Sequence, residues 1–229
     1  MCGRFTVKAT WAELVPLYRL TMDAPPHNLR PRYNVCPTDL VDVVTADDSK
    51  RDLVTMRWGL VPWWWSKPLK EMRVATFNAR AETVETKPVF RDAFKRTRCL
   101  IPLSGYYEWR NKPNGKQPWY FTAADGSPLL TAAGLWDEWK NRETGERMKS
   151  CTMVITEPNE FAAEIHDRMP VFLMEDQFAP WLSGEARIEY LKPIPNDYLQ
   201  RWPVSKRVNS SKADADDPTL IEPVERAIA

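Results

Sequence analysis

The chain has 229 residues, 43% of them hydrophobic and 28% charged, a composition that is ordinary for a soluble globular protein. The formal net charge of +1 excludes a global attraction to nucleic acid or membrane, so any anionic ligand must be held by a local patch. No apolar run approaches transmembrane length and no signal peptide is evident, which predicts a cytoplasmic protein without membrane association.

The four cysteines are far apart, without a Cys-x-x-Cys pair, and the chain has only two histidines. This spacing argues against a zinc site and a disulfide scaffold and is typical of a reducing compartment. We therefore expect neither a metal nor a cofactor. The 11 tryptophans exceed what one core of this size needs, so some are expected at a surface that binds something flat.

Short elements fill the first half of the chain. In order, they are a helix opened by a capping box at 10–13 and limited by Pro16, a β hairpin of residues 40–45 and 53–58 with a polar turn at 47–50, and helical structure between Val84 and Phe94.

The second half is rich in β segments. They comprise residues 99–109, 118–122, 129–139 and 149–156, separated by turns at 114–115 and 125–126 and by the loop 141–146, and helices are expected at 159–165 and 175–182. Hairpins without a βαβ rhythm predict an α+β fold, with a mostly antiparallel, curled or barrel-like β core and flanking short helices. Without a repeat or linker, residues 1–229 are expected to form a single domain in which 210–229 is a polar, mobile tail.

Position 2 has the most distinctive chemistry. Met1 before a small residue is readily removed, which would leave Cys2 with a free α-amine next to its thiol. The usual pKa values, about 8 for the amine and about 8.5 for the thiol, leave both groups partly reactive near neutral pH. Such an aminothiol condenses with an aldehyde to a thiazolidine ring, which an internal cysteine cannot do. The alternative is that Cys2 is incidental.

Two further candidates are Asn78 and Glu108. Asn78 could orient a nucleophile while nearby Arg80 binds a phosphate, although an Asn that caps a helix would fit the same spacing. Glu108 lies among aromatic residues, where desolvation would raise its pKa and suit it to proton transfer. The alternative is a carboxylate that points into solvent from the end of a strand.

His166 is followed by Asp167 and Arg168, and histidine is the side chain best suited to acid–base catalysis near pH 7. A structural histidine is the alternative, and that interpretation is preferred for His27, which lies in a Pro-rich loop. Three consecutive tryptophans at 63–65 cannot all be buried on one face, so at least one is expected at the surface. An exposed tryptophan can stack on a base, worth about 1–3 kcal/mol per base.

Taken together, the motifs resemble those of the SOS-response-associated peptidase (SRAP) family, which senses abasic sites in single-stranded DNA. The resemblance covers almost the whole chain, with the motifs in family order. They are Met1-Cys2-Gly3-Arg4-Phe5, Arg32-Tyr33-Asn34, Trp58-Gly59-Leu60-Val61-Pro62, Asn78-Ala79-Arg80-Ala81-Glu82-Thr83, Gly105-Tyr106-Tyr107-Glu108-Trp109, Thr156, His166-Asp167-Arg168-Met169-Pro170, and Pro203-Val204-Ser205 with Val208-Asn209.

The resemblance implies a covalent reaction. The α-amine of Cys2 would form a Schiff base with the ring-opened abasic sugar, and its thiol would close a thiazolidine that shields the lesion. Asn78 would position the Cys2 end, Glu108 would transfer protons, and His166 would help the sugar open and the crosslink reverse. The self-processing proposed for the family would use the same site, although ordinary methionine removal could suffice here.

The resemblance also implies DNA contacts. Arg4, Arg80 and Arg168 match positions that hold phosphates, Trp64 and Trp65 match aromatics that stack on or separate bases, and Thr156 is expected to contact DNA. Members often carry another basic residue after the motif at 78–80, where this chain offers only Lys87. The expected partner is single-stranded DNA with an abasic site, and the protein is expected to be a monomer.

Two other functions are consistent with the same residues. One is an amidohydrolase or peptidase that uses an N-terminal cysteine, which would tolerate Cys2→Ser better than a thiazolidine-forming enzyme. The other is a non-covalent reader of single-stranded DNA, for which Cys2→Ala would have no effect.

Overall fold

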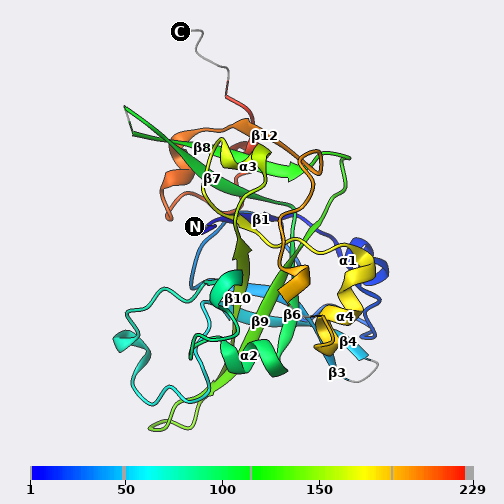
Figure 1. Cartoon of the computed structure of the whole chain (residues 1–229), viewed down its shortest axis with the longest axis vertical. Helices are drawn as coiled ribbons and strands as arrows, with labels where there is room; N and C mark the ends of the chain where they lie inside the picture. Colours follow the sequence, from blue (N-terminus) through cyan, green and yellow to red (C-terminus); the bar gives the residue numbers. More distant parts are fainter. Residues whose placement is uncertain (1, 48–49, 114, 187, 225–229) are drawn as a thin grey trace.

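A computed structural model describes residues 2–47, 50–113, 115–186 and 188–224. Its centre is a closed β barrel (Figure 1) of five strands, β3 (Leu40–Asp47), β4 (Lys50–Trp58), β6 (Arg98–Leu103), β9 (Leu130–Lys140) and β10 (Arg147–Thr156). The strands neighbour one another in the order β10-β4-β3-β6-β9, and the pairing of β9 with β10 closes the ring. Two short strands, β5 (Asn78–Arg80) and β11 (Met169–Pro170), extend the sheet from β10.

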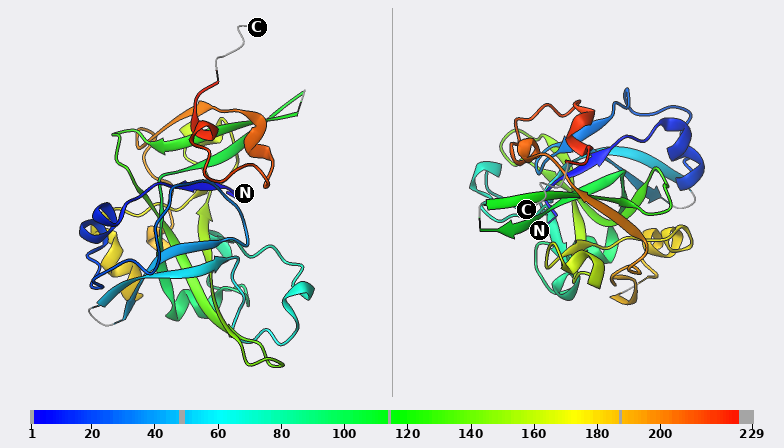
Figure 2. Two further views of the ribbon diagram at one scale, coloured as in Figure 1. Left: turned by 180° about the vertical axis from the view of Figure 1, so that it is seen from behind. Right: turned by 90° about the horizontal axis from the view of Figure 1, so that it is seen from above.

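A second, open sheet lies across one end of the barrel (Figures 1 and 2). Its antiparallel strands follow the order β12 (Leu199–Pro203), β8 (Gly115–Ala123), β7 (Gly105–Lys112), β1 (Phe5–Val7) and β2 (Arg32–Val35). The expected α+β class with a barrel-like core is therefore confirmed. One detail differs from an all-antiparallel core, because β10 runs parallel to both β4 and β5.

The single β segment expected at 99–109 is wrong, because it is two strands in different sheets. β6 belongs to the barrel and β7 to the open sheet, with Ser104 between them. The backbone N–H of Ser104 donates to the carbonyl of Thr6 at 2.8 Å, which directs the chain toward β1. The following residue, Gly105, has no room for a side chain, since an added Cβ would lie 2.3 Å from the Tyr120 hydroxyl and 2.5 Å from the Phe121 carbonyl.

Four short α helices flank the barrel: α1 (Trp11–Tyr18), α2 (Arg91–Arg96), α3 (Glu160–Ala163) and α4 (Phe178–Ser183). The capping box of α1 is present, with the N–H of Thr10 donating to Glu13 at 2.7 Å, and Pro16 lies inside the helix rather than ending it. The helical structure expected between β5 and β6 is present as η2 and α2, which are separated by turns, and the segment expected at 175–182 is divided into η3 and α4. The 3-10 helices are η1 (Leu69–Glu71), η2 (Ala81–Thr83), η3 (Glu175–Gln177), η4 (Ile188–Tyr190), η5 (Lys206–Asn209) and η6 (Pro218–Ile221).

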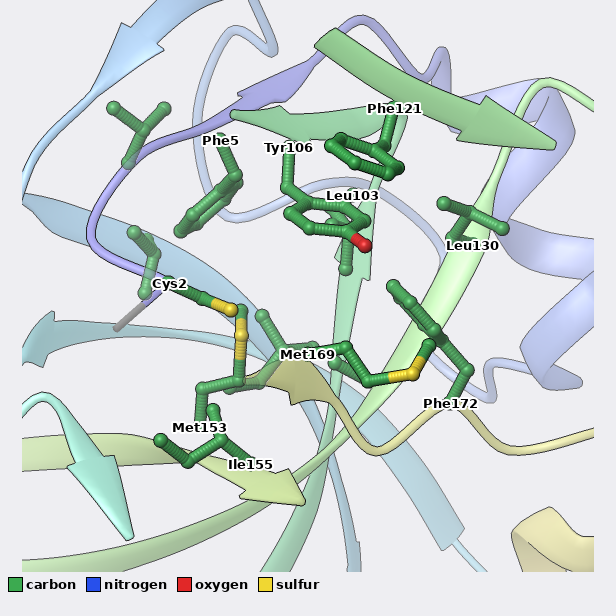
Figure 3. Packing of buried hydrophobic residues seen from close by; sticks show 14 of the residues in the cluster. Cys2, Phe5, Leu103, Tyr106, Phe121, Leu130, Met153, Ile155, Met169 and Phe172 are labelled. Atoms are coloured by element: carbon green, nitrogen blue, oxygen red, sulfur yellow. The ribbon is translucent and has the colours of Figure 1, made fainter. Parts of the chain in front are cut away.

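One of two large core clusters contains residues of both the barrel and the open sheet. Cys2 and Phe5 from the start of the chain pack there with Tyr106, Met153 and other buried residues. Figure 3 shows the Cys2 side chain pointing inward against Met153. Cys2 and Phe5 are therefore part of the core.

Residues 210–224 contact the open sheet, which differs from the mobile tail expected there. Leu220 of η6 is buried in a cluster with Tyr107 and Tyr120. The carbonyl of Ala215 accepts from the N–H of Tyr33 at 2.6 Å, and the N–H of Val224 donates to Pro203 at 2.9 Å. Residues 225–229 of the expected tail lie outside the described residues. Across the described ranges, no helix has the length and apolar character needed to span a membrane.

Candidate active site

Cys2 lies just before β1, and its side chain is buried. Burial raises the pKa of its thiol well above the usual value, and the neighbouring carboxylate of Glu108, a hydrogen-bond partner of the thiol, raises it further. The thiol is therefore protonated near neutral pH and needs a base before it can attack. Met1, whose removal the sequence suggests, lies outside the described residues.

Glu108 reaches Cys2 because β7 pairs with β1. The register places Phe5 opposite Tyr106, and the N–H of Tyr107 donates to the carbonyl of Arg4 at 3.0 Å. The side chain of Glu108 is only 2% exposed, so the alternative of a solvent-facing carboxylate is wrong. Burial raises the pKa of Glu108 from 4.5 to about 7, so the protonated and ionised forms are similarly populated at neutral pH.

His166 follows α3, and its Nε2 atom lies 3.7 Å from Oε2 of Glu108. Burial lowers the pKa of the imidazole, which favours the neutral ring at neutral pH. The Nδ1 atom accepts the backbone N–H of Arg168 at 3.1 Å, which assigns the proton of the neutral ring to Nε2, on the side of Glu108. The carboxylate of Asp167 also lies 3.1 Å from Nδ1, but its 88% exposure leaves it screened by water.

Asn78 lies on strand β5, so the alternative of a helix cap is wrong. Its backbone is in register with Met153, the residue that packs against Cys2 in Figure 3. The amide Nδ2 donates to the Phe77 carbonyl at 3.2 Å. Within the described part of the chain, the buried Oδ1 has no hydrogen-bond partner. A buried acceptor without a donor is rare, and it suits a group that arrives with a substrate or with a newly freed amine.

The three arginines expected at phosphates differ in their surroundings. Arg80 is exposed at the end of β5. Arg168 forms a two-pronged ion pair with Glu82, with nitrogen–oxygen distances of 2.6 and 3.0 Å. Arg4 donates to the side chain of Asn34 at 2.5 Å and to the Val208 carbonyl at 2.7 Å. Arg4 therefore links the start of the chain to the C-terminal segment.

Thr156 is buried at the end of β10, and its hydroxyl donates to the Leu191 carbonyl at 3.3 Å. It lines a pocket of about 590 Å³ with Glu82, Glu157 and Arg168. Thr156 and Arg168, both expected to contact DNA, thus line one cavity, which Arg80 does not line.

The tryptophan loop is partly exposed, as the sequence predicts. Trp63 is 54% and Trp64 is 36% exposed, while Trp65 is half-buried. The rings of Trp64 and Trp65 lie 6.5 Å apart at 57°. The loop is anchored to β9, because the carbonyl of Trp65 accepts from Trp139 at 2.6 Å and the N–H of Trp63 donates to Asp137 at 2.9 Å.

Lys116 is a site residue that the sequence interpretation missed. It lines a pocket of about 500 Å³ with Glu108, Trp109, Asn111, His166 and Asn209. A sequence signal was available, since no acidic residue occurs between Glu108 and Asp125. His27, by contrast, pairs with Asp42 at 2.9 Å and lines a different pocket. In the described ranges, no three His, Cys, Asp or Glu side chains gather as metal ligands would.

Several known proteins resemble this chain. A solved structure from Bacteroides thetaiotaomicron superposes with a TM-score of 0.87 over 98% of this chain and 100% of that chain, at 23% identity, which supports the fold. Abasic site processing protein YoaM of Bacillus subtilis is 34% identical over 93% of this chain and 94% of its own length. Abasic site processing protein YedK of Escherichia coli is 29% identical over 98% of this chain and 100% of its own length.

A family model, described as SOS response associated peptidase (SRAP), matches residues 1–211. The match confirms the resemblance seen in the motifs. The chain belongs to the SRAP family.

Proposed function

We propose that this protein processes abasic sites in single-stranded DNA by forming a covalent crosslink through Cys2, after removal of Met1. The observation that carries the proposal is the meeting of three groups at one place: the Cys2 thiol, a Glu108 carboxyl whose pKa burial raises to about 7, and the His166 imidazole 3.7 Å from it. Similarity to proteins named for abasic site processing supports the choice of substrate.

The reaction begins at the amine rather than at the thiol. Because burial raises the pKa of the Cys2 thiol, that group is a weak nucleophile until a base removes its proton. The α-amine attacks the aldehyde carbon of the open sugar, and loss of one water gives a Schiff base. The thiol then adds to the same carbon while its proton moves to the nitrogen by way of Glu108. The sum is aldehyde plus aminothiol giving thiazolidine plus water.

His166 assists the opening of the abasic sugar ring. An abasic deoxyribose is mostly a closed ring, and it opens when its ring oxygen receives a proton while the anomeric hydroxyl loses one. Glu108 takes the proton of the hydroxyl and returns it to the ring oxygen, to which the Nε2–H of His166 donates a hydrogen bond. The unpaired Oδ1 of Asn78 accepts an N–H of the Cys2 amine and so orients it toward the aldehyde.

The surrounding residues hold the strand. Arg80 and Arg168 bind phosphates on either side of the lesion, and Thr156 lies in the pocket next to Arg168. Trp64 stacks on a neighbouring base, next to the tilted ring of Trp65. Arg4 contributes its charge near the strand while it ties the chain together. A monomer carries all of these residues and is the proposed active form.

The test uses the wild type, Cys2→Ala and Cys2→Ser with single-stranded DNA that bears one abasic site. We expect a shifted band on a denaturing gel for the wild type alone, with an intact mass equal to the protein without Met1 plus the DNA minus one water. The serine variant should give no lasting product, because its hydroxyl closes a much less stable ring.

Two outcomes would overturn the proposal. If wild-type protein shown to lack Met1 gives no shifted band, the reaction is not the one written here. If Cys2→Ser instead retains activity on an amide substrate, the chain is an amidohydrolase that uses an N-terminal nucleophile.

A further inference from the structure

A basic hairpin extends from the candidate site. Strand β7 carries Glu108 and continues to Lys112, and β8 returns from Gly115. Beyond Trp109 the hairpin bears Arg110, Lys112 and Lys116, all exposed. In Figures 1 and 2 it projects from the open sheet on the side of the molecule where the N-terminus lies. The charges are therefore on the side of the molecule where the chain begins.

These three cations are not neutralised by the protein. No Asp or Glu occurs between positions 108 and 125. Among the described residues, none of the three takes part in an ion pair, whereas Arg147 and Arg168 each contact a carboxylate. With a net charge of only +1 for the whole chain, such a cluster creates a local positive field.

Lys116 joins the hairpin to the reacting groups. Its register partner on β7 is Asn111, and both line the pocket of about 500 Å³ that also contains Glu108 and His166. The charge of Lys116 is near enough to contribute to the lowered pKa of His166, after the larger effect of burial. An anion in this pocket would therefore lie between the hairpin and the acid–base pair.

One wall of this pocket is held in place by a hydrogen bond between two of its side chains. Trp109 forms one side, and its indole N–H donates to the side chain of Asn209 at 2.7 Å. The guanidinium of Arg4 lies 5.9 Å from the same ring. Amide and ammonium groups on an aromatic wall suit the sugar–phosphate backbone of a nucleic acid, and they carry no hydrogen-bonding pattern specific for one base.

We propose that the described residues of the β7–β8 hairpin, 109–113 and 115–117, form a second nucleic-acid contact surface that binds backbone phosphates next to the lesion, with Lys116 holding the phosphate nearest to His166. This inference rests on the proposed function, because it requires the lesion-bearing strand to enter at Cys2. The hairpin adds a second set of phosphate contacts to those of Arg80 and Arg168, because Lys116 and Arg168 line different pockets. These contacts bind DNA without regard to sequence.

The test compares Lys116→Gln and the double variant Arg110→Gln/Lys116→Gln with Lys140→Gln. Lys140 is an exposed lysine at the end of β9, and its hairpin lies at the opposite pole of the molecule in Figure 1, so it controls for the loss of one charge. The first readout is the affinity for a fluorescent single-stranded oligonucleotide without a lesion, measured by anisotropy across a range of salt concentrations.

We expect Lys116→Gln to bind about fivefold more weakly at low salt, and the slope of log affinity against log salt to become shallower by about 0.7 for each phosphate that the variant no longer neutralises. Lys140→Gln should match the wild type. The second readout is the crosslinking rate at protein concentrations below saturation, with oligonucleotides shortened on one side of the lesion. Shortening the side that the hairpin contacts should abolish the difference between the wild type and Lys116→Gln.

The hairpin surface is refuted if Lys116→Gln and Lys140→Gln behave alike at every salt concentration and length. It is also refuted if the weakening in Lys116→Gln is independent of both salt and length, because that pattern indicates a structural role or an effect on His166 alone. Since the anisotropy measurement requires no crosslink, it decides the role of the hairpin even if the wild type forms no covalent product.

Discussion

The Nε2 atom of His166 lies 3.7 Å from Oε2 of Glu108, and burial shifts the pKa values of the two groups in opposite directions. The pKa of the carboxyl rises to about 7 while that of the imidazole falls below its usual value. Near pH 7, Glu108 therefore populates both its protonated and its ionised form, while the neutral form of His166 is favoured. Glu108 can then accept or donate a proton at little cost, as a reversible proton transfer near neutral pH requires.

The first prediction concerns the pH dependence of crosslinking. If Glu108 accepts the thiol proton, the rate should rise with pH and level off above a midpoint near 7, because only the ionised carboxyl is a base. The α-amine of Cys2 also loses its proton near pH 8, so the wild-type profile combines two steps. Glu108→Gln should lower the crosslinking rate about 100-fold. Its pH–rate profile should keep only the step that comes from deprotonation of the α-amine. Single-turnover rates between about pH 5.5 and pH 9 are the measurement.

A conservative variant separates proton transfer from packing. Glu108→Asp retains a carboxyl. Its crosslinking rate should be lower than that of the wild type, but its pH–rate profile should still show the step that comes from ionisation of the carboxyl. If Glu108→Gln showed the wild-type profile, Glu108 would have no part in proton transfer.

The second prediction concerns stability, because the buried carboxyl of Glu108 lowers the free energy of unfolding when it ionises. Its pKa is 4.5 in the unfolded chain and about 7 when folded, so the folded state binds more protons between these values. The free energy of unfolding therefore falls as pH rises through this window, by about 3 kcal/mol in total. Gln has no such cost. Urea unfolding at about pH 5 and about pH 8 should show that the free energy of unfolding of Glu108→Gln, relative to that of the wild type, is higher at pH 8 than at pH 5. An equal difference at both values would contradict the raised pKa.

The sequence predicted those parts of the fold that depend on neighbouring residues. The capping box of α1, the β3–β4 hairpin and the exposure of the tryptophan loop all follow from local spacing or local crowding. The gathering of Cys2 and Glu108 was expected from the family resemblance alone. Nothing in the local pattern near either residue reveals that β1 pairs with β7.

Other features depend on contacts between distant residues and were missed. The break between β6 and β7 at Ser104 is made by a hydrogen bond to Thr6, almost 100 positions away. The ion pair of Arg168 with Glu82 spans 86 positions. The C-terminal segment was interpreted as a tail from its polarity, whereas its few apolar residues, such as Leu220, are buried against the open sheet.

The third prediction concerns Glu82. Its carboxylate contacts both terminal nitrogens of Arg168, the positions that a phosphate would use for two-pronged binding. Glu82→Gln should therefore tighten binding to single-stranded DNA by about threefold and steepen its dependence on salt, because a competing anion is removed. Filter binding or anisotropy across salt concentrations is the measurement.

The matched control for this change is Glu157→Gln. Glu157 lines the same pocket, and within the described residues it makes no ion pair with Arg168. It should therefore have a smaller effect on affinity. Weaker binding by Glu82→Gln would instead mean that the ion pair holds Arg168 in its active orientation.

The fourth prediction concerns Asn34, a buried residue of β2 that connects both ends of the chain. Its Oδ1 accepts from Arg4 at 2.5 Å, and its Nδ2 donates to the carbonyls of Ser210 and Ala213 at 3.2 and 3.1 Å. Asn34→Leu would remove these three hydrogen bonds, each worth about 1 kcal/mol, while Arg4 keeps its bond to the Val208 carbonyl. We expect the free energy of unfolding to fall by roughly 3 kcal/mol in urea titrations.

The control for Asn34→Leu is Asn28→Leu, at an exposed position, which should change the unfolding free energy by less than about 0.5 kcal/mol. Limited proteolysis adds a local readout. Since the carbonyls of Ser210 and Ala213 have one hydrogen-bond donor fewer in Asn34→Leu, cleavage within 210–224 should become faster than in the wild type under native conditions. If the two variants unfolded at the same urea concentration and were cleaved alike, Asn34 would not be what holds the C-terminal segment on the open sheet.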